Sequence, residues 1–266
     1  MRFLASRRER ACLAAQRLGQ HFLTHRPLLE RIVEAVCPAR EPLVVEIGSG
    51  RGALTEFLLA RAERVVAIEI DAALVHRLQQ KFQAQPRLTI IQADVLKTRL
   101  DEWGPAVIAG NLPYYITSPI LEAILRLGPG WRRAVLLVQR EVADRLTARP
   151  GSRDYGYLTV ATNLFAVPEM LFRVPPAAFS PRPQVDSAAV RLTPRSPADS
   201  WGIRAPAPFL EFVSRCFRHK RKTLRNNLLE VYGRQVERWP EAPLRAEQLA
   251  LEQFLDLYGR IESLSH

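Results

Sequence analysis

Short apolar runs alternate with amphipathic stretches along the middle of the chain. Runs rich in Val and Ile predict buried strands at 43–47, 64–68, 88–92, 106–109 and 134–138. Apolar residues at helical spacing predict helices at 53–61, 72–83, 120–127 and 142–148. This alternation predicts an α/β fold with a doubly wound, mostly parallel sheet, which binds ligands at the carboxyl ends of its strands.

Two more β-like runs, 169–174 and 187–192, follow a helical stretch at 158–165. A Pro-rich loop joins these two runs, and we expect them to close one edge of the sheet as an antiparallel pair. The Pro-, Ser- and Ala-rich composition of 194–208 is typical of a linker.

Helical spacing resumes beyond the linker, at 209–232 and 246–258. We therefore expect a basic N-terminal arm, a sheet domain and a small all-helical C-terminal domain, at 1–17, 18–195 and 205–266.

Residues suited to binding a ligand follow the ends of the predicted strands. The first strand runs into Gly48-Ser49-Gly50-Arg51-Gly52, whose glycines allow a tight turn and close approach of a ligand to the backbone. The second strand ends at Glu69, which can accept ribose hydroxyls, and the third at Asp94, which can accept from an adenine amino group. These acids suit a sulfonium and repel a pyrophosphate. The layout therefore favours S-adenosylmethionine (SAM) over NAD, whose fingerprint has the spacing G-x-G-x-x-G.

The fourth strand runs into Asn111-Leu112-Pro113-Tyr114, which has the form [DNS]-[IPL]-P-[YF] found in methyltransferases that act on conjugated amino groups. The Asn111 side-chain oxygen and the Leu112 carbonyl can both accept from an adenine N6, which favours a tetrahedral nitrogen with its lone pair free. Pro113 fixes the turn, and Tyr114 can stack on the base for about 1–3 kcal/mol. Catalysis would then rest on positioning and electrostatics.

A target adenine must leave its stack to enter such a pocket, so a second aromatic ring is expected to clamp it. The candidate is Phe179, in the stiff Pro-rich loop 175–183. The alternative is that Phe179 is a core residue.

The net charge of the chain indicates what kind of partner it binds. Lys and Arg number 38 and Asp and Glu 27, which leaves a formal charge of +11 and favours a polyanionic partner. In a helix at 209–232, one face would carry a basic stripe suited to RNA phosphates, made of Arg215, Arg218, Lys222 and Arg225. The alternative is an ordinary solvated helix.

Other classes of protein are excluded or disfavoured. Cys12, Cys37 and Cys216 show no paired spacing, which argues against a disulfide framework and points to a reducing cytosol. No uncharged apolar run reaches the roughly 18–20 residues of a membrane helix, and the N-terminus lacks the apolar core of a secretory signal. His21 and His25 have no third ligand, so no metal is expected. We expect a cytoplasmic protein without a membrane partner.

Six stretches of the chain together match one family of enzymes, at 18–23, 45–50, 110–116, 139–146, 179–187 and 221–228. On these stretches the chain resembles the bacterial small-subunit (16S) rRNA adenine N6,N6-dimethyltransferases, the KsgA family. The resemblance implies a Rossmann-like class I SAM-dependent methyltransferase fold with a seven-stranded sheet. It also implies that SAM is contacted by six residues, His21, Leu23, Gly48, Glu69, Asp94 and Asn111. The glycine loop adds Gly50 as a seventh candidate. Many members have Asn where this chain has His21, whose neutral ring can still donate one hydrogen bond.

The resemblance further implies the substrate: two adjacent adenines in the 3′-terminal hairpin of 16S rRNA, within a late 30S assembly intermediate, methylated by a monomer. Two alternatives stay open. One is a large-subunit rRNA methyltransferase of the macrolide-resistance type, and the other is an assembly factor that binds RNA without catalysis. The arm at 1–17 lies outside the resemblance and is either an RNA contact or part of a targeting peptide.

Overall fold

The computed structural model describes residues 20–195, 201, 203 and 206–263. The chain divides into two compact units. The first unit comprises Met1–Ala143 and Glu169–Pro194, and the second comprises Asp144–Pro168 and Arg195–His266.

The second unit thus takes in 144–168, which the sequence analysis assigns to the sheet domain. The expected division at 18–195 and 205–266 stays a prediction. The arm at 1–17 and most of the linker at 194–208 lie outside the described residues.

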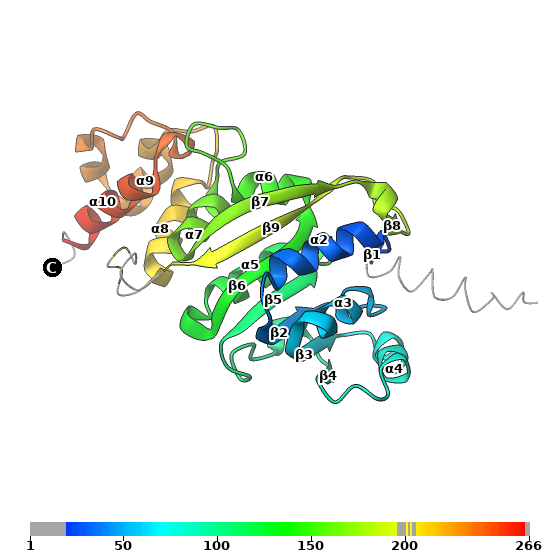
Figure 1. Ribbon diagram of the computed structural model, residues 1–266. Coiled ribbons are helices and arrows are strands. Elements are labelled where there is room, and N and C mark those ends of the chain that lie inside the picture. The colour runs from blue at the N-terminus through cyan, green and yellow to red at the C-terminus, as the bar shows by residue number, and fades with distance from the viewer. Residues whose placement is uncertain (1–19, 196–200, 202, 204–205, 264–266) are drawn as a thin grey trace, which may run out of the picture. The chain divides into compact units, whose positions relative to one another are not determined.

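A seven-stranded sheet forms the centre of the first unit, in the order β4-β3-β2-β5-β6-β9-β7 (Figure 1). The strands are β2 (Glu41–Ile47), β3 (Ala62–Glu69), β4 (Leu88–Gln92), β5 (Ala106–Asn111), β6 (Trp131–Gln139), β7 (Ala166–Val174) and β9 (Ser187–Pro194). β2 to β6 pair in parallel, and β9 runs antiparallel to β6. The predicted fold class and the two late strands at one edge are confirmed.

The central strands are apolar on both faces because both faces of the sheet are buried. Val65, Val44 and Val107 lie side by side in three neighbouring strands and are fully buried. They belong to a core cluster with Ile32 and Leu58, which come from helices. The intervening residues face the opposite side of the sheet and are buried as well, so each strand reads as a continuous apolar run.

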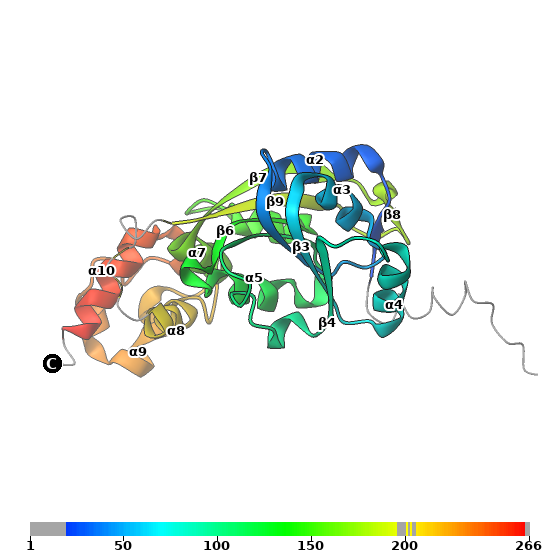
Figure 2. The same cartoon turned by 60° about the horizontal axis from the view of Figure 1, so that its bottom comes forward.

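Helices cover both faces of this sheet. Figure 2 shows α2 and α3 on one side and α5 on the other. The helices of the first unit are α2 (Arg26–Val36), α3 (Ala53–Arg61), α4 (Ala72–Lys81) and α5 (Thr117–Leu125), while α6 (Arg140–Leu146) crosses into the second unit. The sequence analysis missed α2, although Pro27 in its first turn and buried apolar residues at i, i+3 and i+4 spacing signal a helix.

A short two-stranded sheet ties the start of the described chain to the loop before β9. β1 (Phe22–Leu23) pairs antiparallel with β8 (Phe179–Ser180), and Thr24 donates to the carbonyl oxygen of Ala178 at 2.9 Å. Two segments far apart in the sequence therefore lie side by side beside the main sheet.

The second unit is helical and has its own core. Its helices are α7 (Tyr157–Phe165), α8 (Pro206–Cys216), α9 (Leu224–Tyr232) and α10 (Leu251–Glu262). Phe209, Phe212 and Phe254 are fully buried at its centre. In the described residues, no helix is both long enough and apolar enough to cross a membrane.

The expected single helix at 209–232 is wrong, because 217–223 form a turn between α8 and α9. The Thr223 side chain accepts from the N–H of Asn226 and caps α9. The buried Asn227 amide closes the turn: its nitrogen donates to the Cys216 carbonyl at 2.9 Å, and its oxygen accepts from the His219 N–H at 3.1 Å. A capping residue and a buried Asn outweigh the apolar periodicity.

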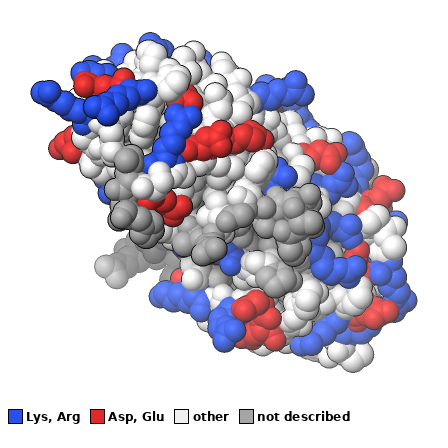
Figure 3. Space-filling model, turned by 90° about the vertical axis from the view of Figure 1, so that its left-hand side faces the viewer, with Lys and Arg blue, Asp and Glu red and all other residues white. Residues whose placement is uncertain are grey.

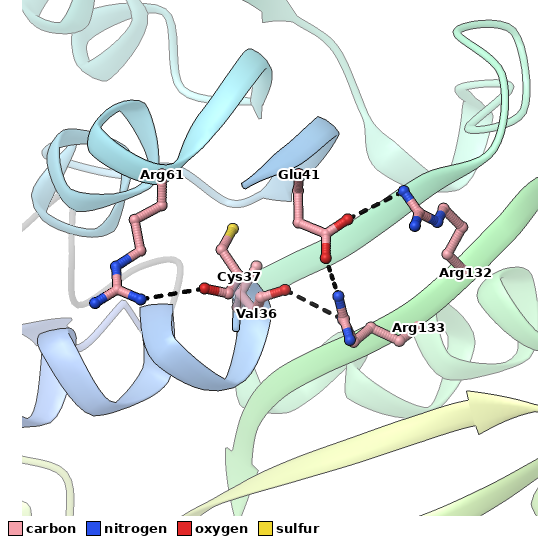
Figure 4. A network of polar contacts seen from close by, with 6 residues as sticks. All are labelled: Val36, Cys37, Glu41, Arg61, Arg132 and Arg133. Carbon is pink, nitrogen blue, oxygen red and sulfur yellow. Dashed lines mark hydrogen bonds and ion pairs between the residues drawn. The ribbon is translucent and has the colours of Figure 1, made fainter. Parts of the chain in front are cut away.

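An ion-pair network around the buried Glu41 lies at the amino end of β2 (Figure 4). Glu41 is 4% exposed and forms ion pairs with Arg133 and with Arg132, whose Nη1 lies 3.1 Å from Glu41 Oε2. Arg133 also donates to the Val36 carbonyl at 3.2 Å, and Arg61 donates to the Cys37 carbonyl at 3.3 Å. Arg133 thus joins the end of α2 to β2 and β6, and Arg61 joins α3 to the residue that follows α2.

A second buried carboxyl lies near the other end of β2. Glu46 is 2% exposed, and its Oε2 accepts from the Thr55 hydroxyl at 2.6 Å, which joins β2 to the first turn of α3. Burial raises the pKa of Glu46 from its ordinary 4.5 to about 7, although the hydrogen bond from Thr55 opposes this shift.

Replacing Arg133 should destabilise the protein through the charge that it leaves behind. Arg133→Met leaves the buried Glu41 carboxylate with Arg132, whose side chain is half exposed, as its remaining ion-pair partner, so the free energy of unfolding should fall by about 1–3 kcal/mol. Urea denaturation measures this loss. The double variant Glu41→Leu/Arg133→Met should recover most of it, because the buried carboxylate is gone. A double variant as unstable as Arg133→Met would contradict the electrostatic explanation.

The raised pKa of Glu46 predicts a pH-dependent cost. The folded state holds this proton more tightly than the unfolded state, so stability falls as the pH rises from 4.5 through 7. Glu46→Gln should therefore be more stable than wild type at pH 8, by up to about 3 kcal/mol, with a smaller difference at pH 5. Urea unfolding at both pH values tests this, and a difference independent of pH would contradict it.

Candidate functional site

The carboxyl ends of β2, β3, β4 and β5 surround a cavity in the first unit, which we call the first cavity. Its space is about 760 Å³, including its open mouth. Nine of the residues expected from the sequence line it together: His21, Gly48, Gly50, Glu69, Asp94, Asn111, Leu112, Pro113 and Tyr114. The prediction that strand ends bring these residues together matches their positions, while their roles stay predictions.

Glu69 holds the floor of this cavity in place. Glu69 is 3% exposed, and its carboxylate accepts from the N–H groups of Gly50, Ile70 and Asp71 at 2.8, 2.9 and 3.0 Å. These bonds fix the glycine loop against the end of β3. A carboxylate has about four acceptor positions, so the three bonds leave roughly one for a ligand hydroxyl.

The glycine loop has backbone angles that other residues rarely adopt. Gly48 and Gly50 have φ of 70° and 57°. A Cβ at Gly50 would lie 3.0 Å from the Phe22 ring, so a side chain here would push that ring away. The loop can therefore approach a ligand closely only with glycine at these positions.

Asn111 is oriented by its own hydrogen bond. Its side-chain nitrogen donates to the backbone oxygen of His21 at 2.7 Å. The amino end of the amide is thus engaged, which leaves the Oδ1 as the group that can accept from a substrate. The next residue, Leu112, donates its N–H to the Leu137 carbonyl at 3.0 Å and so anchors the motif to β6.

His21 braces the motif. Its Nδ1 donates to the Pro181 carbonyl at 2.9 Å, and its ring lies 5.5 Å from the Tyr114 ring, centroid to centroid. The one N–H of a neutral imidazole is therefore already used. What a neutral His21 offers to the cavity is an acceptor, rather than the donor considered from the sequence.

Tyr114 is fixed at both ends. Its hydroxyl lies 2.7 Å from the hydroxyl of Ser187, which is fully buried at the start of β9. Burial raises the pKa of the Tyr114 hydroxyl above its ordinary value, although the bond with Ser187 opposes this shift, so the phenol stays neutral. The sequence analysis gave no role to Ser187, although it lies inside the stretch 179–187.

Asp94 lies two residues after the end of β4 and also lines the cavity. Its Oδ1 accepts from the Leu96 N–H at 3.0 Å and caps the short helical turn Val95–Lys97. Glu69 and Asp94 make this cavity acidic, since the described residues that line it include neither Lys nor Arg.

Leu23 and Phe179 lie elsewhere. They are paired in register between β1 and β8, they are 5% and 3% exposed, and both belong to the main core cluster. Neither is among the described residues that line the first cavity. Phe179 thus occupies the position of a core residue, the alternative left open above, and its role as a clamp on the target base stays a prediction.

A second cavity adjoins the first. The two share the lining residues Phe22, Gly48, Gly50 and Asn111. The second is also lined by Leu23, Glu46, Arg51 and the first residues of α3. The sequence analysis gave no role to Arg51, and the signal that was available is its place inside the glycine loop.

The expected basic stripe is not on one helix face, because the turn 217–223 separates its members. Arg215 forms an ion pair with Glu211, and Arg225 forms one with Glu237. The turn has four exposed cations without an acidic partner in the described part of the chain: Arg218, Lys220, Arg221 and Lys222. Of these, Lys220 donates to the Arg153 carbonyl. On the face seen in Figure 3, Lys and Arg side chains lie among Asp and Glu side chains.

Metal ligands do not cluster in the part of the chain that the structure describes, where no group of three or more His, Cys, Asp or Glu could hold an ion. Two of the three cysteines are described, Cys37 and Cys216, and both are buried and free. Burial raises the pKa of Cys37 to about 11. These thiols are therefore unreactive core groups.

Comparison with known proteins gives consistent relatives. Residues 13–263 match the family model described as ribosomal RNA adenine dimethylase. The "Ribosomal RNA small subunit methyltransferase A" of Acidobacterium capsulatum is 42% identical, covering 99% of this chain and 98% of its own. The protein of the same name from Bordetella pertussis is also 42% identical, covering 92% of each chain.

Two solved structures are similar over 91% of this chain. One is a dimethyladenosine transferase from Plasmodium falciparum, with a TM-score of 0.78, 25% identity and 98% of that chain covered. The other is the 23S rRNA methyltransferase ErmE, with a TM-score of 0.70, 30% identity and 99% covered. The cavity of acids and glycines at the strand ends, the Asn-Leu-Pro-Tyr motif and these matches agree, and the chain belongs to the ribosomal RNA adenine dimethylase family.

Proposed function

We propose that this protein transfers methyl groups from SAM to the N6 atoms of two adjacent adenines in the 3′-terminal hairpin of 16S rRNA. The product is N6,N6-dimethyladenosine, and the substrate is a late 30S assembly intermediate, on which a monomer acts in the cytoplasm without a metal. The observation that carries the proposal is Asn111, whose amide is held with its oxygen free inside an acidic cavity.

The first cavity fits SAM by its chemistry. Glu69 and Asp94 give it two carboxylates that attract a sulfonium and can accept from ribose and adenine. The positive φ of Gly48 and Gly50 lets the backbone come close to a ligand. Bound SAM supplies an electrophilic methyl group, and the side chains around the cavity position its acceptor.

The Asn-Leu-Pro-Tyr motif is suited to hold an adenine amino group. The Asn111 oxygen accepts one N6 hydrogen and the Leu112 carbonyl accepts the other, so the nitrogen lone pair points to the methyl group. Tyr114, fixed by Ser187 and His21, presents its ring to the base. The N6 proton can leave to water, so no general base is required.

The turn between α8 and α9 offers a contact for RNA phosphates. Arg218, Arg221 and Lys222 are exposed there without acidic partners in the described residues, whereas Arg215 and Arg225 are neutralised by glutamates. Of the four cations expected from the sequence, Arg218 and Lys222 are therefore the stronger candidates, and Arg221 joins them.

The substrate is tested by transfer of labelled methyl groups from SAM to under-methylated 30S particles, followed by nucleoside analysis. N6,N6-dimethyladenosine in the 3′-terminal hairpin is the expected product. Label in 23S rRNA, assayed in parallel, would indicate the activity in the name of ErmE instead. Tight binding of the particle without transfer would indicate an assembly factor.

Asn111→Ala should lower the rate of methyl transfer by about 100-fold or more, because it removes an acceptor that acts on the reacting nitrogen. Single-turnover transfer to 30S particles measures this loss. The matched control is Asn163→Ala in the second unit. The Asn163 side chain donates to the Thr159 carbonyl in α7, so this variant should transfer methyl groups at the wild-type rate. Equal rates for Asn111→Ala and wild type would contradict the assignment.

Replacing Arg218, Arg221 and Lys222 together by Ala should weaken binding to 30S particles and flatten its salt dependence, by a slope of about 0.7–0.9 per lost phosphate contact. The control is Arg215→Ala/Arg225→Ala, which removes cations that already have acidic partners and should change the slope less. Binding measured across a series of salt concentrations tests both variants. A triple variant with the wild-type slope would contradict the RNA contact.

A further inference from the structure

The second cavity adjoins the first at the glycine loop. Phe22, Gly48, Gly50 and Asn111 line both cavities, so a ligand in one can extend into the other. SAM has three parts: an adenosine, a sulfonium and an amino-acid tail with one carboxylate and one ammonium. The acids Glu69 and Asp94 suit the adenosine and the sulfonium, but they repel the carboxylate of the tail.

Arg51 supplies the missing charge. It is the one Lys or Arg among the described residues that line either cavity. Its guanidinium lies over the Phe22 ring, with Cζ 4.2 Å from the ring centroid, and Phe22 in turn packs against Gly50. A guanidinium stacked on a ring is held in place, and its planar fork matches a carboxylate with two hydrogen bonds.

The start of α3 adds a second feature that favours an anion. The helix begins at Ala53 after the N-cap Gly52, which has no side chain to accept from the N–H groups of the first turn. Ala53 and Leu54 both line the second cavity. The N–H groups without a side-chain cap and the positive end of the helix dipole attract a carboxylate to the end of α3 beside Arg51.

The other ionisable residue in the described lining of the second cavity is Glu46. Because its raised pKa leaves this carboxyl partly neutral near neutral pH, Arg51 is the dominant charge that a carboxylate meets in the second cavity. We propose that Arg51 binds the carboxylate of the methionine part of SAM in the second cavity, and so selects donors that carry an intact amino-acid tail. This inference rests on SAM being the methyl donor.

The role of Arg51 is tested by measuring the affinities for SAM and decarboxylated SAM by calorimetry. SAM and decarboxylated SAM differ by the carboxylate alone. Arg51→Gln should weaken SAM binding by about 10- to 100-fold, the value of charge-assisted hydrogen bonds, and leave the affinity for decarboxylated SAM within about 3-fold of wild type. Arg51→Lys, which keeps the charge but loses the planar fork, should lie between wild type and Arg51→Gln for SAM.

The matched control is Arg31→Gln. Arg31 also stacks on an aromatic ring, with Cζ 4.0 Å from the Phe172 centroid, but it lines neither cavity. It should bind both ligands like wild type. Equal losses for SAM and decarboxylated SAM in Arg51→Gln would overturn the proposal, since they would show that Arg51 only supports the loop. Wild-type protein that binds neither ligand would instead contradict the proposed SAM site as a whole.

Discussion

The site depends on the hydrogen bonds of the Glu69 carboxylate, which hold two loops together. Parallel strands end at the same edge of a sheet, but this alone does not fix the loops that leave them. Glu69 accepts from Gly50, Ile70 and Asp71, and so it ties the loop after β2 to the end of β3. The Asn111 bond to His21 does the same for the loop after β5. The cavity is therefore shaped by hydrogen bonds that exist without a ligand.

The parts that the sequence predicted are those set by local rules. Buried strands of a parallel sheet read as Val- and Ile-rich runs, and the residues after them lie at one edge, which placed Glu69, Asp94 and Asn111 together. The apolar periodicity at 209–232 wrongly predicted one helix. Thr223 caps a second helix there, and the buried Asn227 closes the turn before it. Those bonds depend on a tertiary environment that apolar spacing does not report.

Roles that depend on long-range contacts were also beyond the sequence. The Pro181 carbonyl, 160 residues away, decides which nitrogen of His21 carries the proton. The pairing of β1 with β8 decides that Phe179 is buried. In the same way, Arg51 gains its proposed meaning only from the Phe22 ring on which it rests and from the cavity beside it.

The pairing of β1 with β8 also has a consequence for synthesis on the ribosome. His21 and Tyr114 take their final positions only when Pro181 and Ser187 are present, so the site needs residues from both ends of the first unit. A nascent chain can form β2 to β5 early, because their contacts are closer in sequence. The site itself is completed only after β9 has left the exit tunnel. A chain truncated before that strand would have the glycine loop, but its Asn-Leu-Pro-Tyr motif would lack the contacts that hold it in place.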